Sequence, residues 1–333
     1  MAGGIEAIAA SISADLCRRL PRQNKKQREG LASLVATMLN VRSANLMELS
    51  ASLPRAAERI DMRYQWISRL LGNAHIDTDA VMAPFAREVL ERASADGRRL
   101  VLIIDQTQAN DTQQAVVVAV RIAGRSLPIA WRVKETEGAI GFAEQKAALE
   151  TARVLLPTGA QVVLMGDRFY GSPDLIAWCA KQGWDWRLRL KADLLVFEDG
   201  GESTVAECFA RGERMLTGVE LTAKRVATNI GMVHEEGHPE PWFIAMSDAP
   251  TTAKTCDYGL RWGIEAMFSD FKSRGFGLED SQLQRVDRMD RLILVMTLAL
   301  YWAVSTGMWA AEHAALPVEK KRPALVRKSW LAA

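Results

Sequence analysis

A chain of 333 residues is long enough for two or three domains, and 49% hydrophobic with 25% charged residues is typical of a soluble globular protein. This composition excludes an extended disordered chain. The formal net charge is only +2, so bulk charge does not indicate a nucleic-acid partner. The four cysteines form no CxxC pair, and no basic stretch precedes an apolar run at the start of the chain. We therefore expect reduced thiols, no signal peptide and a cytoplasmic location.

Residues 1–97 are predicted to form a helical DNA-binding domain, because apolar residues recur there at helical spacing. Within it, two segments separated by a break near Pro54 resemble a helix-turn-helix. The candidate DNA contacts in this motif are Arg55, Arg59, Arg63, Gln65 and Arg69. The alternative is an amphipathic helix whose arginines are merely solvated.

After Gly97 the pattern changes to buried strands. Residues 100–105 are an apolar run that ends in Asp105, as expected of a central strand whose end opens into a site. Two more strands follow, and Gly124 between them has the freedom of φ that a tight turn needs. The opening of this region is therefore predicted to be three consecutive strands.

The next elements alternate between helix and strand. A helix over 141–156 precedes an apolar strand that ends in Asp167, then come a helix that begins at Ser172 and a strand over 185–191. Three strands, helix, strand, helix, strand and a later helix is the element order of a ribonuclease-H-like α/β domain. We predict that fold for the catalytic part of the chain.

The remaining boundaries follow from composition. Frequent glycines in 192–250 indicate a β-rich insertion, which divides the catalytic domain into 98–191 and 251–316. Residues 317–333 are basic and interrupted by proline, and we expect this tail to be loosely held.

Residues 292–311 form an uncharged run of twenty residues, which is long enough to span a membrane. Polar residues dilute the run, and a helix that is apolar all round also occurs at the centre of a large core. We predict a buried helix and no membrane partner.

The chemistry is expected to centre on residues 258–272. At about 100° per residue, four polar positions of one helix share an arc of roughly 60°. They are Tyr258, Arg261, Glu265 and Lys272. On geometry alone, a functional stripe and a ladder of surface salt bridges are equally consistent with this spacing.

Two carboxylates at strand ends and one on a helix, Asp105, Asp167 and Glu265, suit a pair of divalent cations. Their oxygens are hard ligands that leave room for substrate and water. Three such anions in one pocket would repel each other and stay partly protonated without cations. We expect two Mg²⁺ ions per site, with Mn²⁺ as a substitute, and no nucleotide cofactor.

The polar positions also resemble a known family. The spacing Tyr-x2-Arg-x3-Glu-x6-Lys is a signature of the cut-and-paste DDE transposases of bacterial insertion sequences, and it is reproduced by Tyr258, Arg261, Glu265 and Lys272. An Asp that ends the opening strand, a second Asp followed by Arg168, and a β-rich insertion before the Glu helix match the family as well. The resemblance covers about 100–311.

The resemblance implies a bacterial, nucleoid-associated enzyme that cuts DNA at terminal inverted repeats and joins it to target DNA. It implies that the metal ligands and catalytic residues are Asp105, Asp167 and Glu265. It implies DNA contacts by Tyr258, Arg261, Lys272 and Arg168. Trp242 resembles a tryptophan that stacks on a flipped base in some relatives, although it could equally be a core residue of a strand, and Trp262 has the same ambiguity. The partners implied are double-stranded DNA and a second copy of the chain.

Two other functions stay open. They are a DNA-binding protein without catalysis and a nuclease that cuts without strand transfer. A further motif is dismissed: HEEGH at 234–238 formally matches the HExxH zinc pattern, but the surrounding glycines and prolines predict a turn.

Overall fold

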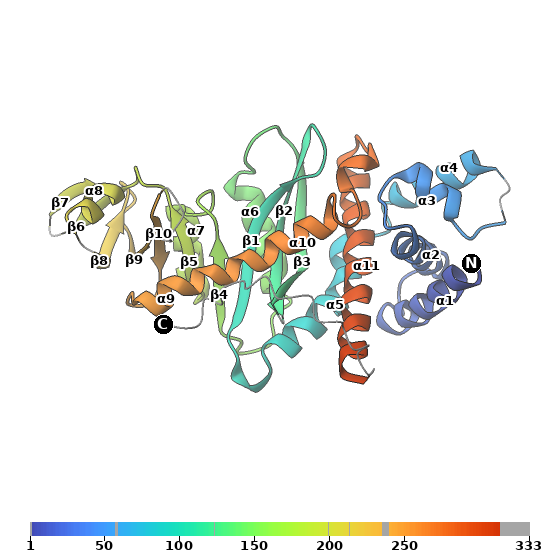
Figure 1. Cartoon of the computed structure of the whole chain (residues 1–333), viewed down its shortest axis with the longest axis horizontal. Helices are drawn as coiled ribbons and strands as arrows, with labels where there is room; N and C mark the ends of the chain where they lie inside the picture. Colours follow the sequence, from blue (N-terminus) through green and yellow to red (C-terminus); the bar gives the residue numbers. More distant parts are fainter. Residues whose placement is uncertain are drawn as a thin grey trace, which may run out of the picture.

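A computed structural model describes residues 2–56, 59–122, 124–198, 200–212, 214–234 and 240–313. The predicted basic tail at 317–333 and most of the HEEGH motif lie outside these residues. In the part described, a group of helices is followed by a ten-stranded mixed sheet with helices on both faces (Figure 1).

The N-terminal region is helical, as predicted. Its α-helices are α1 (Ala2–Arg19), α2 (Lys25–Val41), α3 (Leu46–Ser52), α4 (Ile60–Leu71) and α5 (Thr78–Ala93). Side chains of Asn24, Asn45 and Asp77 cap three of them by accepting backbone N–H groups of the first turn. α3 and α4 pack on each other at the position of the predicted helix-turn-helix, and its DNA contacts stay a prediction.

The sheet begins with an antiparallel meander. Its strands are β1 (Leu100–Gln108), β2 (Gln113–Ile122), β3 (Arg125–Glu135), β4 (Val162–Gly166), β5 (Asp185–Leu190), β6 (Leu195–Glu198), β7 (Gly201–Thr204), β8 (Met215–Leu221), β9 (Val226–Val233) and β10 (Trp242–Met246). Their order is β3-β2-β1-β4-β5-β10-β9-β8-β6-β7, with β4 parallel to both β1 and β5. The turn between β2 and β3 contains Gly124 with φ +80°, as its conformational freedom predicted.

The segment 192–250 is largely β-structure, but its strands do not stand apart from the catalytic sheet. β10 pairs with β5 on one side and with β9 on the other, so β6–β9 extend the same sheet. β10 therefore joins strands β6–β9 of this segment to β5 of the 98–191 part through main-chain hydrogen bonds.

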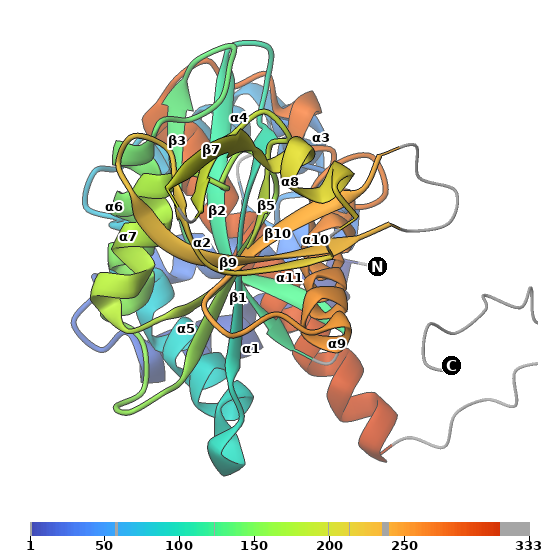
Figure 2. The same ribbon diagram turned by 90° about the vertical axis from the view of Figure 1, so that its left-hand side faces the viewer.

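Helices cover both faces of the sheet. α6 (Phe142–Arg153) and α7 (Pro173–Gln182) lie on one face, and α9 (Thr252–Cys256) and α10 (Gly263–Phe271) lie on the other (Figure 2). The predicted start of α7 is confirmed: the hydroxyl of Ser172 accepts the N–H of Leu175 at 3.3 Å, and Pro173 occupies the first turn. The remaining helical elements are η1 (Ala95–Gly97), α8 (Val205–Ala210), η2 (Asp257–Trp262) and η3 (Leu278–Ser281).

The long helix α11 (Val286–His313) stands between helices α1–α4 and the sheet, whereas α5 packs on β2 and β3 (Figure 1). α11 packs on α2, α4, α5 and β3, and every residue from 292 to 301 is buried. The segment Val286–Ala310 is long and apolar enough to cross a membrane, but 56% of its most apolar window is buried inside the protein. The prediction of a buried helix over 292–311 is confirmed for 292–301 and wrong for 303 and 305–309, which are exposed because the end of α11 extends beyond the core.

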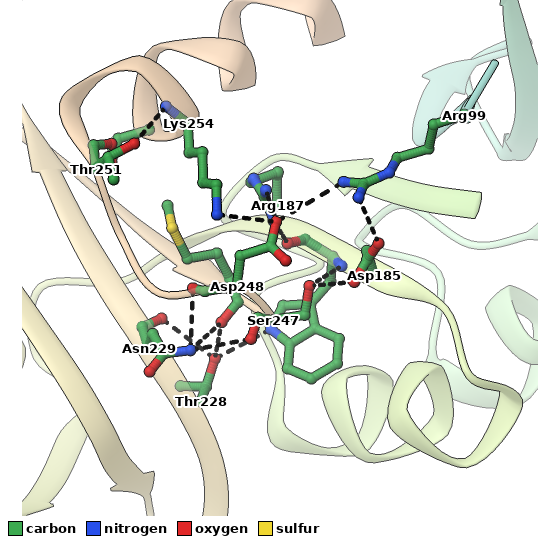
Figure 3. A network of polar contacts seen from close by, with 12 residues as sticks. Arg99, Asp185, Arg187, Thr228, Asn229, Ser247, Asp248, Thr251 and Lys254 are labelled. Atoms are coloured by element: carbon green, nitrogen blue, oxygen red, sulfur yellow. Dashed lines mark hydrogen bonds and ion pairs between the residues drawn. The ribbon is translucent and has the colours of Figure 1, made fainter. Parts of the chain in front are cut away.

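A charge network joins β5 to the residues that follow β10 (Figure 3). The guanidinium of Arg187 is only 2% exposed and donates to the carboxylate of Asp248 at 2.6 Å and to the carbonyl oxygen of Trp186 at 2.8 Å. Arg99 and Lys254 approach the same Asp248 oxygen at 3.7 and 3.9 Å. The hydrogen bond from Arg187, followed by the nearby positive charges, holds the pKa of Asp248 below its usual value despite partial burial.

Candidate active site

Two acids and an arginine lie side by side at the neighbouring strands β1, β4 and β5. The prediction that Asp105 ends its strand is wrong, because β1 continues to Gln108, whereas Asp167 directly follows β4 as predicted. The parallel ladders pair Ile104 with Gly166 and Gly166 with Leu188. The residues that follow these pairs are Asp105, Asp167 and Arg189. Neighbouring strands are about 4.8 Å apart, and side chains at matching positions of parallel strands point to the same face. The strand register therefore brings Asp105 and Asp167 together.

Glu265 joins this group through an arginine. It lies in the first turn of α10, and Arg261 lies one turn earlier in η2. The Arg261 guanidinium donates from Nη1 to Asp105 Oδ2 at 3.0 Å and from Nη2 to Glu265 Oε1 at 2.8 Å. The side chain of Arg261 is 11% exposed, whereas that of Glu265 is 57% exposed. One guanidinium thus bridges a strand acid and a helix acid.

The surroundings of Asp105 disfavour its charged form. Burial is the main cause and the charge of Asp167 is the next, and with a smaller contribution from Glu265 they raise the pKa of Asp105 from 3.8 to about 6. Arg261 and the N–H of Gln106, which donates to Asp105 Oδ1 at 2.8 Å, act in the opposite direction. A single guanidinium therefore does not balance the negative charge of the site.

We expect Asp105→Asn to stabilise the folded protein at neutral pH. Because the pKa of Asp105 is raised in the folded state, ionisation of Asp105 destabilises the fold. This destabilisation is absent below the unfolded pKa of 3.8 and is fully present above about pH 6. Urea unfolding in EDTA at pH 7.5 should show the variant more stable by about 2–3 kcal/mol, and the difference should shrink towards pH 4.5. The exposed Asp111→Asn serves as the control. A gain that is equal at both pH values would contradict this.

Residues 258–272 do not form the single α-helix predicted from the sequence. η2 is a 3-10 helix, α10 is α-helical, and Lys272 follows α10 with φ −96° and ψ −140°. Tyr258 is 4% exposed and points into the protein. The prediction of one polar stripe from Tyr258 to Lys272 is therefore wrong, although Arg261 and Glu265 do share a face.

The break in the helix has a local cause. Gly259 and Gly263 lower the helix propensity of this segment by about 1 kcal/mol each relative to alanine. The absence of a side chain at Gly259 also lets the indole of Trp262 pack closely, since a Cβ there would lie 3.3 Å from Trp262 Cζ3. Packing of Trp262 on Gly259, three residues earlier in the chain, thus favours the tighter 3-10 turn.

Aromatic side chains form a wall beside the acids. The ring of Trp242 meets those of Tyr258 and Trp262 edge to face, with centroids 6.1 and 5.3 Å apart. The guanidinium of Arg189 lies over Trp242 at 5.5 Å. The three aromatic residues line a cavity of about 380 Å³, which Thr255 also borders. Trp242 thus belongs to strand β10 and also lines this cavity. Its stacking on a flipped base stays a prediction.

Of the other predicted DNA contacts, Lys272 and Arg168 lie near the acids in the chain, whereas Arg63 and Arg69 lie on a separate helix. Lys272 pairs with Glu279 at 2.8 Å just beyond α10, and Arg168 is exposed next to Asp167. Arg63 and Arg69 lie on α4, which is separated from the sheet by α11 (Figure 1). The last two arginines therefore belong to a separate surface.

The sequence interpretation missed Arg189 and Tyr170. Arg187 and Arg189 occupy equivalent positions in the alternating segment 185–190. The sequence therefore does not show that Arg189 lies beside the acids whereas Arg187 pairs with Asp248. Tyr170 is fully buried beside Gly166, where an added Cβ would lie 2.7 Å from Tyr170 Cβ. Burial, followed by the charges of Asp105 and Asp167, raises the pKa of its hydroxyl. In the sequence, the only sign that Tyr170 packs here is the absence of a side chain at Gly166, just before Asp167.

Comparison with known proteins adds to this geometry. Residues 143–302 match the family described as Transposase DDE domain. The chain therefore carries a transposase DDE domain, the domain of a DNA transposase enzyme. The matched residues of the transposase include Asp167 and Glu265, whereas Asp105 precedes them in the chain. A search of curated proteins finds no match.

DDE transposases generally use divalent metal ions, and the acids of this transposase suit such ions chemically. Carboxylate oxygens are the preferred ligands, and cations would relieve the repulsion that raises the pKa of Asp105. Within the described ranges, however, no three His, Cys, Asp or Glu side chains are gathered closely enough to hold a metal ion. Arg261 donates to one oxygen each of Asp105 and Glu265, so a metal ion on these oxygens would compete with the guanidinium.

Proposed function

We propose that this transposase catalyses cut-and-paste transposition of an insertion sequence at terminal inverted repeats. The observation that supports this most directly is the grouping of Asp105, Asp167 and Glu265 around Arg261. The strand order β3-β2-β1-β4-β5, with β2 antiparallel and β4 parallel to β1, supports a ribonuclease-H-like catalytic fold. Two divalent cations held by the acids would supply activation of the attacking oxygen and stabilisation of the leaving oxygen.

The basic residues around the acids are proposed to hold the DNA backbone. Arg261 offers a planar pair of donors to a phosphate, and Lys272 offers a point charge. Arg189 and Arg168 flank Asp167 and supply further positive charge at the strand ends. The phenol of Tyr258 orients the neighbouring guanidinium of Arg261, whose Cζ lies 5.8 Å from the ring centroid.

The cavity beside Trp242 is proposed to receive an unpaired base near the cut. Its aromatic wall offers ring faces and edges for stacking, which contributes about 1–3 kcal/mol per base. By its resemblance to insertion-sequence transposases, we further propose that the protein acts in the bacterial cytoplasm as a homodimer on paired transposon ends.

Incubation of the purified protein with Mg²⁺ and duplex DNA that carries the element's ends tests this function. The ends can be found as short inverted repeats that flank the gene and are bounded by a duplicated target. Joined DNA products support transposition. Cut products without joining would favour a nuclease, and band shifts without cutting would favour a DNA-binding protein.

Lys272→Gln should weaken DNA binding for all sequences alike, because a phosphate contact carries no sequence information. The slope of log affinity against log salt concentration should fall by about 0.9, the value for one phosphate contact. Fluorescence anisotropy over a salt series measures it. Lys224→Gln, which breaks an exposed pair with Asp174, is the matched control. An unchanged slope in Lys272→Gln would remove Lys272 from the DNA interface.

A further inference from the structure

Arg261 donates to carboxylate oxygens of two of the three acids that are proposed to hold the cations. Its Nη1 and Nη2 atoms lie 3.0 and 2.8 Å from Asp105 Oδ2 and Glu265 Oε1. The side chains of Arg261 and Asp105 are 11% and 15% exposed, so water screens their contact little. A divalent cation on these oxygens would displace the guanidinium or lie next to a like charge.

The bridge also holds the two acids from different elements. Asp105 belongs to β1 and Glu265 to α10. In the described part of the chain, Arg261 of η2 makes the side-chain hydrogen bonds that connect η2 to these two elements. Glu265 is the exposed partner, so the site opens to solvent on its side. A ligand that draws Arg261 away from that side would free oxygens of both acids at once.

A DNA phosphate is such a ligand. Guanidinium binds phosphate in the same two-pronged manner as carboxylate, so Arg261 can exchange its acidic partners for a backbone phosphate without loss of hydrogen bonds. The Nε atom of Arg261 is buried and has no acceptor within the described residues, so the present contacts do not use all its donors.

We infer that Arg261 is an internal counter-ion that competes with divalent cations for Asp105 and Glu265, and that DNA binding releases the acids by drawing Arg261 onto a phosphate. This rests on the proposed function, since it assumes that the acids hold the metal and that Arg261 contacts DNA. Because coupling between two ligands is reciprocal, DNA should tighten metal binding and metal should tighten DNA binding. The device limits metal-dependent cutting chemistry to chains that already hold DNA.

The test is a titration of the full-length protein with Mn²⁺, in which electron paramagnetic resonance reports the free ion. Without DNA, Arg261→Gln should bind Mn²⁺ about tenfold more tightly than wild type, within the usual range of coupling between ligands. Arg261→Lys, which keeps the charge but not the two-pronged geometry, should lie between them. Arg125→Gln is the matched control, because its pair with Asp270 at 3.3 Å joins α10 to β3 outside the acidic group, and its affinity should equal that of wild type.

A second titration adds duplex DNA of arbitrary sequence at low salt, corrected for Mn²⁺ bound by DNA alone. Wild type should gain affinity for Mn²⁺, and Arg261→Gln should gain little because its acids are already free. Equal or weaker Mn²⁺ binding by Arg261→Gln without DNA would overturn the inference.

Asp105→Asn separates this inference from the proposed metal site. If Asp105→Asn binds Mn²⁺ as wild type does, the acids do not hold the metal, and both proposals fail. If Asp105→Asn loses binding while Arg261→Gln equals wild type, the metal site stands and only the competition is refuted.

Discussion

Glu265→Gln should reduce DNA cleavage at least about a thousandfold, which corresponds to about 4 kcal/mol of transition-state stabilisation. The proposed metal site loses a negatively charged oxygen ligand, while the amide oxygen can still accept from Arg261. In EDTA, where no metal is bound, the variant should bind the transposon ends no more weakly than wild type, since Glu265 itself repels phosphate. Cleavage of end-labelled duplex and a band-shift titration measure the two properties.

Asp270→Asn is the matched control for that variant. It lies on the same helix and also pairs with an arginine, Arg125, but it lies outside the acidic group. Its cleavage rate should equal that of wild type. Retained cleavage by Glu265→Gln would refute the assignment of Glu265 as a catalytic residue, and loss of both cleavage and DNA binding would point to a structural role instead.

Asp248→Ala should destabilise the fold by about 3–5 kcal/mol, because it leaves the guanidinium of Arg187 buried and without its carboxylate partner. The same change removes the acid that Arg99 and Lys254 approach (Figure 3). The pKa of Asp248 is lowered in the folded state, so its contribution is fully present above its unfolded pKa and is lost as pH falls through the lowered value. Urea unfolding at pH 7 measures the loss.

Two further variants isolate the buried charge as the cause. Asp248→Asn keeps an acceptor for Arg187 and should lose less stability than Asp248→Ala. Asp174→Ala breaks an exposed pair with Lys224 and should change the free energy of unfolding by less than about 1 kcal/mol. If Asp248→Ala and Asp174→Ala cost the same, the network does not join β5 to β10 in the manner described.

Several features of the fold were predictable because their causes are local. The turn at Gly124 and the capped start of α7 at Ser172 depend on the conformational freedom and hydrogen-bonding capacity of single residues. The apolar runs that end in Asp105 and Asp167 predicted buried strands because both faces of a central strand are covered. The apolar run 292–311 predicted a buried helix in the same way, which holds for 292–301 only.

The segment 258–272 shows where local reasoning failed. Periodicity assumes one helix type throughout, but packing of Trp262 against Gly259 and of Tyr258 against Trp242 selects a 3-10 turn and buries Tyr258. The same limit explains Arg189. Its position beside Asp167 depends on the register between β4 and β5, which residues distant in the chain determine.

By itself, the sequence determined most of the helices and strands and singled out Asp105, Asp167 and Glu265 as candidate acids, because hydrophobic patterns and motif spacing are properties of neighbouring residues. Only the tertiary structure decided that β10 continues the catalytic sheet, that Arg187 is buried and Arg189 borders the acids, and that Arg261 bridges Asp105 and Glu265. These relations join residues up to 156 positions apart, and strand pairing and burial of charge establish them only when the chain is folded.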